Sequence, residues 1–335
     1  MKWLIKSLRT SALFVGSIVG AGFATGQEVS LFFGSDGVLS VVVASLFMAI
    51  CAFAFMEIGA RGGVSVGVRI ATDTLVSLSS FAVYAAMIAA AEEVLSSLTG
   101  QDGISLFLAV GVGVFFARGR GNLSLLNLLA VPFMIVIILI VGGRVGGSIV
   151  GGFHLLSALA YGGMNLLFSG ALMVGEGEES TQRERIAASI MSGAMIFLML
   201  LFMRRCATGG SDMPFLDAAD REGVGCAARI SLLLAILTTM ASCAYLGIDR
   251  LRTVTGDTLL SVGLVTLSGV ALSAFGFAPI VRTTYPIVSY LGLAATIAAL
   301  ALSLFRLFGG ESGGNFWKKF PHQKSPRRID GGERS

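Results

Sequence analysis

Two clusters of small and polar residues interrupt otherwise apolar stretches of the chain. The first stretch reads FVGSIVGAGFATGQEVSLFF and carries glycines at positions 16, 20, 22 and 26, followed by Gln27 and Glu28. On a helix, the first two glycines fall on one face and the last two on another. One stripe of glycines would indicate close helix packing of the GxxxG type. Two stripes favour a locally unwound segment.

A second interruption lies near the middle of the chain, where Tyr161-Gly162-Gly163-Met164-Asn165 separates the apolar runs 150–160 and 166–175. Interruptions at matching positions of two halves are typical of transporters built from inverted repeats. Unwinding leaves backbone N–H and C=O groups without partners where water is scarce, so these groups must line a cavity or bind something. Freed carbonyls suit a cation, and the N-termini of half-helices suit an anionic group.

Side-chain hydroxyls form a third feature, in the apolar run 224–247. Ser231, Thr238, Thr239 and Ser242 share one helical stripe with Ala235. Hydroxyls on such a stripe either bond to neighbouring helices or line a polar site. The stripe alone does not separate these two hypotheses.

The composition places these features in a membrane protein. Hydrophobic residues make up 55% of the 335 positions, and charged residues make up 13%, whereas soluble domains carry roughly 25% charged residues. A soluble fold of this composition could not cover its surface with polar atoms. Basic residues gather at both ends of the apolar body, which indicates contact with anionic membrane lipid and argues against a nucleic-acid partner.

Apolar stretches of about 20 residues are long enough to span a bilayer as helices. The sequence predicts an all-α polytopic fold with ten of them: 10–33, 37–60, 75–98, 103–118, 122–142, 150–175, 183–204, 224–247, 257–276 and 285–308. The connections 61–74 and 205–223 are long enough to hold surface helices. We expect a transmembrane transporter domain over residues 1–310, with repeat one at about 10–142 and repeat two at about 150–308. Residues 311–335, rich in Gly, Pro and charge, are expected to form a disordered basic tail.

The distribution of basic residues orients these spans. An even number of spans places both termini on one side of the membrane. With the termini inside, 18 of the 24 Lys and Arg residues fall on the inner side and six on the outer side. This bias follows the positive-inside rule. We therefore expect a multi-pass protein of the cell (inner) membrane with cytoplasmic N- and C-termini.

The segments GSIVGAGFATGQEVSLFF, Tyr161–Asn165 and Leu237-Thr238-Thr239 together resemble the YkvI-type bacterial membrane proteins. More distantly, they resemble LeuT-fold transporters of the amino acid–polyamine–cation superfamily. The resemblance implies a five-plus-five inverted repeat with unwound helices 1 and 6. It also implies alternating access, in which a cation drives the transport of a small organic solute that is amino-acid- or amine-like.

The resemblance also implies a set of binding residues. In sodium-coupled LeuT-fold proteins, one Na⁺ lies between the unwound first helix and helix eight. The matching positions here are Gly16, Val19, Ala235, Thr238 and Thr239, so we expect Na⁺ as the coupling ion and no other cofactor. The implied solute site consists of Ile18, Gly20, Ala21, Gly22, Phe23, Tyr84, Met87, Ala91, Tyr161, Gly162, Gly163 and Asn165.

Glu28 directly follows the first interruption, and an ionisable group within a span is a candidate functional residue. Its carboxylate could serve as a proton carrier, as a gate or as an acceptor for freed N–H groups. The alternative to sodium coupling is therefore a proton-coupled transporter or exporter that uses Glu28. A channel and a non-transporting membrane sensor are further hypotheses. An enzyme is not expected, because no His, Asp or metal set is positioned for catalysis.

Labelling of introduced cysteines tests the topology. Because the inner side holds 18 of the 24 basic residues, positions 1–9 and 311–335 should react only after the membrane has been opened. Residues 205–223 should react from outside intact cells. Labelling of the 311–335 tail from outside would exclude the ten-span arrangement.

Overall fold

The computed structural model describes residues 2–62, 66–116, 120–146, 149–207 and 213–308, which are almost entirely helical. The helices are α1 (Lys2–Ile18), α2 (Ala21–Ala24), α3 (Gln27–Phe33), α4 (Val38–Ala60), α5 (Val66–Thr99), α6 (Ile104–Phe116), α7 (Arg120–Val145), α8 (Leu155–Glu178), α9 (Gln182–Cys206), α10 (Pro214–Arg221), α11 (Gly225–Thr255), α12 (Thr258–Ser273) and α13 (Phe277–Phe308). The all-α prediction is confirmed for these residues.

Each predicted span coincides with one helix or, for the first span, with the series α1 to α3. The connection 205–223 holds the short helix α10, as expected. No separate surface helix precedes α5 in the described part of the connection 61–74, because α5 itself begins at Val66. The predicted tail 311–335 lies outside the described residues.

Six of the described helices are long and apolar enough to cross a membrane: Val38–Ala60, Leu123–Val145, Leu155–Glu178, Gln182–Cys206, Gly225–Thr255 and Pro279–Ala301. The helices α6 and α12 are apolar but shorter. The first predicted span does not contribute a long helix because it is broken into three pieces. The chain is a multi-pass membrane protein.

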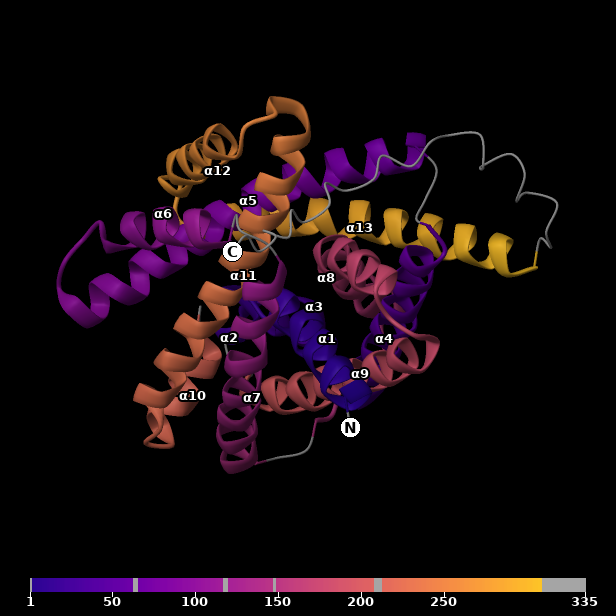
Figure 1. The fold of residues 1–335 in the computed structure, drawn as a ribbon. Coiled ribbons are helices and arrows are strands. Elements are labelled where there is room, and N and C mark those ends of the chain that lie inside the picture. Colours follow the sequence, from indigo (N-terminus) through magenta and orange to yellow (C-terminus); the bar gives the residue numbers. More distant parts are fainter. Residues whose placement is uncertain (1, 63–65, 117–119, 147–148, 208–212, 309–335) are drawn as a thin grey trace, which may run out of the picture.

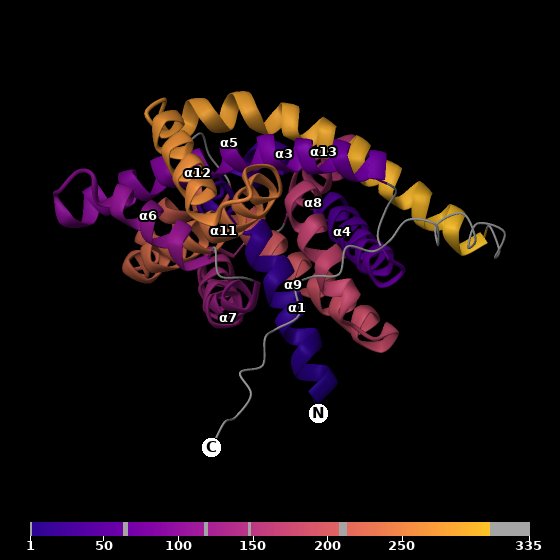
Figure 2. The same cartoon turned by 45° about the horizontal axis from the view of Figure 1, so that its top comes forward.

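The helices pack in two groups that meet along α1 (Figures 1 and 2). The helices α1, α4, α8 and α9 pack against one another in the first group. The helices α5, α6, α11 and α12 pack together in the second. Helix α7 contacts both α1 and α11, and α13 runs across α8 and α5. The break between α1 and α3 therefore lies where the two groups meet.

The interruption predicted in the sixth span is absent. Helix α8 continues unbroken through Tyr161–Asn165. Its two glycines serve close packing instead: a Cβ built on Gly162 would lie 2.6 Å from the Phe47 ring, and one built on Gly163 would lie 2.5 Å from the backbone nitrogen of Leu293. Small residues allow membrane helices to approach this closely. The prediction of an unwound helix 6 was therefore wrong.

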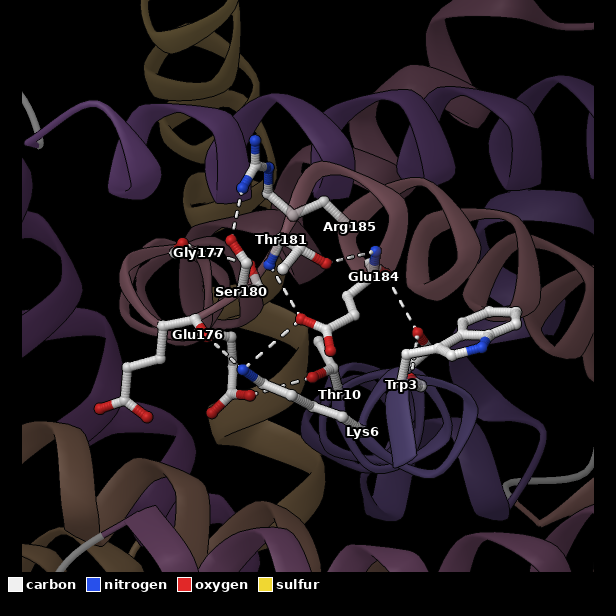
Figure 3. Close-up of polar contacts among 11 residues, drawn as sticks. Trp3, Lys6, Thr10, Glu176, Gly177, Ser180, Thr181, Glu184 and Arg185 are labelled. Carbon is white, nitrogen blue, oxygen red and sulfur yellow. Dashed lines mark hydrogen bonds and ion pairs between the residues drawn. The ribbon is translucent and has the colours of Figure 1, made fainter. Parts of the chain in front are cut away.

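A polar network fastens the N-terminal turns of α1 to the connection between α8 and α9 (Figure 3). The Lys6 ammonium pairs with the Glu184 carboxylate at 3.6 Å and donates to the Glu179 carbonyl. The Thr10 hydroxyl donates to Glu176 Oε2 at 2.9 Å. The Thr10 bond joins the first helix of each predicted repeat, and the Lys6 contacts extend to the start of α9, so together they hold the N-terminal half of α1 in place.

The opposite end of α8 is fastened to the connection between α3 and α4. His154 Nδ1 lies 2.5 Å from Asp36 Oδ1, and Asp36 forms an isolated β-bridge with Gly152. The Arg204 guanidinium donates to the Gly34 carbonyl at 2.8 Å and to the Asp36 carbonyl at 3.2 Å. The segments before α4 and before α8 are therefore held together by backbone as well as side-chain contacts.

Substitution of Gly163 tests the packing role of this glycine. Gly163→Leu should lower the thermal unfolding midpoint in detergent, because overpacking typically costs about 1–3 kcal/mol and the blocking atoms here are backbone. Gly111→Leu is the matched control, since a Cβ on this exposed glycine would meet no atom within 4 Å. An unchanged midpoint in Gly163→Leu would contradict the close approach of α8 and α13.

Candidate functional site

The break in the first span has a defined backbone structure. Helix α1 ends at Ile18, and Val19 and Gly20 are not helical. The Gly20 N–H, which would bond the Gly16 carbonyl in a continuous α-helix, instead donates to the Ile18 carbonyl at 2.9 Å. A second turn separates α2 from α3 at Gly26, whose φ of 81° favours glycine. The interruption predicted for the first span is therefore present.

Helix α11 places a hydroxyl directly on the break. Thr239 Oγ1 donates to the Val19 carbonyl at 3.1 Å. Thr238 Oγ1 bonds within its own helix, to the Ala235 carbonyl at 3.0 Å. Both threonines are buried. A Cβ built on Gly20 would lie 3.2 Å from Thr239 Oγ1, so the absence of a side chain at Gly20 allows α11 to approach the backbone of the break.

The carboxylate of Glu28 is buried at the first turn of α3. Its Oε1 packs against Gly22, where a built Cβ would lie 2.4 Å away. Tyr285 of α13 lies close enough to interact with this carboxylate, and so does the Phe23 backbone. Within the described part of the chain, neither Glu28 Oε2 nor the Tyr161 hydroxyl has a hydrogen-bond partner. Glu28 therefore stands in a buried cluster with two tyrosines.

Part of the expected solute site meets at this cluster. The Tyr161 ring of α8 makes edge contacts with the rings of Phe32 and Phe33, at centroid distances of 5.6 and 5.1 Å. Asn165 Nδ2 donates to the Tyr161 carbonyl at 3.0 Å. From α5, Met87 Sδ lies 3.6 Å from the Cβ position of Gly20. The helices α3, α5 and α8 thus bring polar and apolar groups to the break.

Other residues expected in the solute site have different surroundings. The Tyr84 hydroxyl donates to the Ala109 carbonyl of α6 at 2.9 Å, and its ring packs against Gly269 of α12. Tyr84 therefore points away from the break, although it shares a helix face with Met87. Gly162 and Gly163 contact α4 and α13, as described above. The remaining expected residues, Ile18, Ala21, Gly22, Phe23 and Ala91, are all buried.

Asn127 of α7 was not among the predicted site residues, although its side chain faces the expected cation ligand Gly16. A Cβ built on Gly16 would lie 1.6 Å from Asn127 Oδ1. Asn127 is fully buried. The available signal was an amide in the middle of a predicted span, where polar side chains are costly. The other expected ligands were identified from residue spacings within α1 and within α11. Those spacings carry no information about α7.

Helix α10 covers the other side of the break. The Phe215 N–H donates to the Thr25 carbonyl at 3.0 Å, and Pro214 Cγ lies 3.1 Å from the Cβ position of Gly26. The Arg229 guanidinium of α11 donates two hydrogen bonds to the Asp220 carboxylate, at 2.8 and 2.9 Å. These bonds lower the pKa of Asp220 below its ordinary value. The ion pair holds α10 against α11.

Comparisons with known proteins identify the fold. No protein-family model matches the chain. The structure resembles that of Mhp1, a nucleobase-cation-symport-1 family transporter, in a closed conformation with bromovinylhydantoin bound. The TM-score is 0.58, with 16% sequence identity, over 86% of this chain and 75% of Mhp1. The chain has a LeuT-like fold.

Two further matches describe the extent of this likeness. The LeuT-like fold also matches the inward-facing conformation of Mhp1, with a TM-score of 0.51 and 15% identity over 86% of this chain and 73% of Mhp1. In sequence, a stretch of 58 residues is 34% identical to the uncharacterized protein YyaD of Bacillus subtilis (strain 168). That stretch covers 17% of this chain and 15% of YyaD.

Loss of the Asp220–Arg229 ion pair should loosen α10. Cys206 is buried at the end of α9 near Arg221 and Glu222, whereas Cys226 is exposed. Asp220→Asn should raise the maleimide modification rate of Cys206 by up to about fivefold, because an exposed ion pair contributes about 0.2–1 kcal/mol. Mass spectrometry of the labelled protein measures this rate, with the buried Cys51 of α4 as the internal control. Cys226 is not used as the control, because it interacts with Arg229. Equal Cys206 rates in parent and variant would contradict the holding role.

Proposed function

We propose that this chain is a cation-coupled secondary transporter, most simply driven by Na⁺, that moves a small organic solute by alternating access. The observation that carries the proposal is the hydrogen bond of Thr239 Oγ1 to the Val19 carbonyl, at the end of α1 in a LeuT-like fold. A carbonyl freed by a helix break and hydroxyls on a facing helix are the kinds of ligand that a desolvated monovalent cation requires.

The cation site of this proposal consists of Gly16, Val19, Ala235, Thr238 and Thr239. All five residues are buried, and their ligand oxygens are backbone carbonyls and hydroxyls. Such a site adds no negative charge, so it offsets the dehydration of a monovalent ion more readily than that of a divalent ion. A cation that binds here would take the place of the Thr239–Val19 hydrogen bond and hold the break of α1 against α11.

The membrane arrangement in this proposal has ten spans, with both termini in the cytoplasm. In it, α1 to α3 together form the first span, and α6 and α12 are short spans. The packing supports a five-plus-five repeat, because the first two spans of each half (α1, α4, α8 and α9) group together. The third and fourth spans (α5, α6, α11 and α12) form the other group.

The proposed solute is amino-acid- or amine-like and binds beside the break. This assignment is supported by the backbone, thioether, phenol and amide groups near the break. They belong to Gly20, Gly22, Met87, Tyr161 and Asn165. Glu28 offers an acceptor to an amine.

Sodium-dependent stability of the purified full-length protein tests the coupling ion. The thermal midpoint should rise with NaCl, at ionic strength balanced with choline chloride, because binding to the native state stabilises it. Thr239→Ala and Thr238→Val should each weaken Na⁺ binding roughly ten- to hundredfold, since loss of a polar contact of this kind costs about 1–3 kcal/mol. The double variant should lose the response.

Thr296→Val is the matched control, because Thr296 is a buried threonine of α13 that is not among the proposed ligands. Its Na⁺ response should equal that of the parent. Proton coupling through Glu28 predicts the opposite pattern. In that case solute binding depends on pH, this dependence is lost in Glu28→Gln, and both threonine variants behave like the parent. That result would replace Na⁺ by H⁺ as the coupling ion.

A further inference from the structure

The side-chain oxygen of Asn127 faces the end of α1, and the described residues give it no hydrogen-bond partner. The Asn127 side chain is fully buried, and its Nδ2 donates to the Leu123 carbonyl one turn earlier at 2.9 Å. Only the nitrogen of an amide can donate, so this bond fixes Oδ1 as the atom that faces Gly16. Among the described residues, Oδ1 has no hydrogen-bond partner.

The Asn127 side chain lies so close to position 16 that only glycine fits there. A Cβ on Gly16 would lie 1.6 Å from Oδ1 and 2.5 Å from Cγ of Asn127. Helix α7, which carries Asn127, packs against both α1 and α11. The amide oxygen therefore lies between α7 and α1 at Gly16. The Gly16 carbonyl lacks its usual helical partner, since the Gly20 N–H donates to the Ile18 carbonyl.

A buried amide oxygen without a donor is unfavourable in a protein interior, and more so within a membrane. In native structures such atoms are rare, and an unplaced ion or water is one explanation. Asn127 Oδ1 is such an acceptor, and the carbonyl of Gly16, the residue that it contacts, has lost the Gly20 N–H as its usual donor. A cation is a partner that both oxygens can share, because neither of them can donate to the other.

We propose that Asn127 Oδ1 is a sixth oxygen ligand of the cation site, beside the Gly16 carbonyl. The inference rests on the proposed function and extends its site from two helices to three. Asn127 keeps the site uncharged and selects a monovalent cation. It also couples α7 to cation binding, so that the ion holds α1 against both α7 and α11.

Two substitutions of Asn127 test this role in the purified full-length protein, with the thermal midpoint measured against NaCl and CaCl₂. Asn127→Leu removes the oxygen at similar volume and should weaken Na⁺ binding at least tenfold. Without Na⁺ its midpoint should equal or exceed that of the parent, because an unpartnered polar atom has been removed. Asn127→Asp adds a charge, so it should bind Na⁺ more tightly and acquire stabilisation by Ca²⁺, for which carboxylates are the preferred ligands.

Ser124→Ala is the control, because it removes another buried polar group from α7. Its Na⁺ response should match that of the parent. A purely structural Asn127, in weak Cα–H···O contact with Gly16, predicts a lower midpoint at every Na⁺ concentration with an unchanged Na⁺ dependence. That result would overturn the inference and leave the proposed function intact.

The two proposals fail in different ways. If the parent protein shows no Na⁺ response, the sodium site is wrong and the sixth ligand is wrong with it. If the parent responds and the Asn127 variants respond identically, only the sixth ligand is wrong. Should Asn127→Leu fail to fold, Asn127→Asp decides alone, because unchanged responses to Na⁺ and Ca²⁺ in that variant would overturn the inference.

Discussion

The break in α1 imposes the constraint on which the surrounding structure depends. Backbone groups freed inside a membrane need partners, because water is scarce there. The Val19 carbonyl is bonded by the Thr239 hydroxyl, and the Thr25 carbonyl is bonded by the Phe215 N–H. The first partner comes from α11 and the second from α10. Both helices therefore supply hydrogen-bond donors to backbone carbonyls that the break in the first span leaves without helical partners.

Two glycine clusters in this chain have similar patterns and opposite outcomes. At Gly20 and Gly26 the helix stops, and Gly26 takes a positive φ. At Gly162 and Gly163 the helix continues, and the missing side chains let Phe47 and the Leu293 backbone approach α8. A glycine permits both outcomes. Which one occurs depends on the neighbouring helices, and these are not visible in the local sequence.

The same distinction separates the predictions that succeeded from those that failed. The positions of the spans follow from local composition, so each span was predicted. Most of their ends were predicted to within a few residues, but α1, α5 and α13 begin, and α11 ends, eight or nine residues beyond the predicted bounds. The spacing of Ala235, Thr238 and Thr239 is a property of one helix. Thr239 lies beside Val19 in the structure, and the cation site itself stays a prediction. The direction of the Tyr84 side chain depends on Ala109 and Gly269 of other helices. Asn127 was missed for the same reason.

One continuous segment of the chain contacts the break on two sides. It runs from Phe215 in α10 to Thr239 in α11, and the Asp220–Arg229 ion pair and the bond of the Val224 N–H to the Ala219 carbonyl keep its two helices together. A cation that replaces the Thr239–Val19 bond therefore acts on the same segment that covers Thr25 and Gly26. In the proposed function, the segment that would hold the cation through Thr239 is therefore the same segment that covers the break through Phe215.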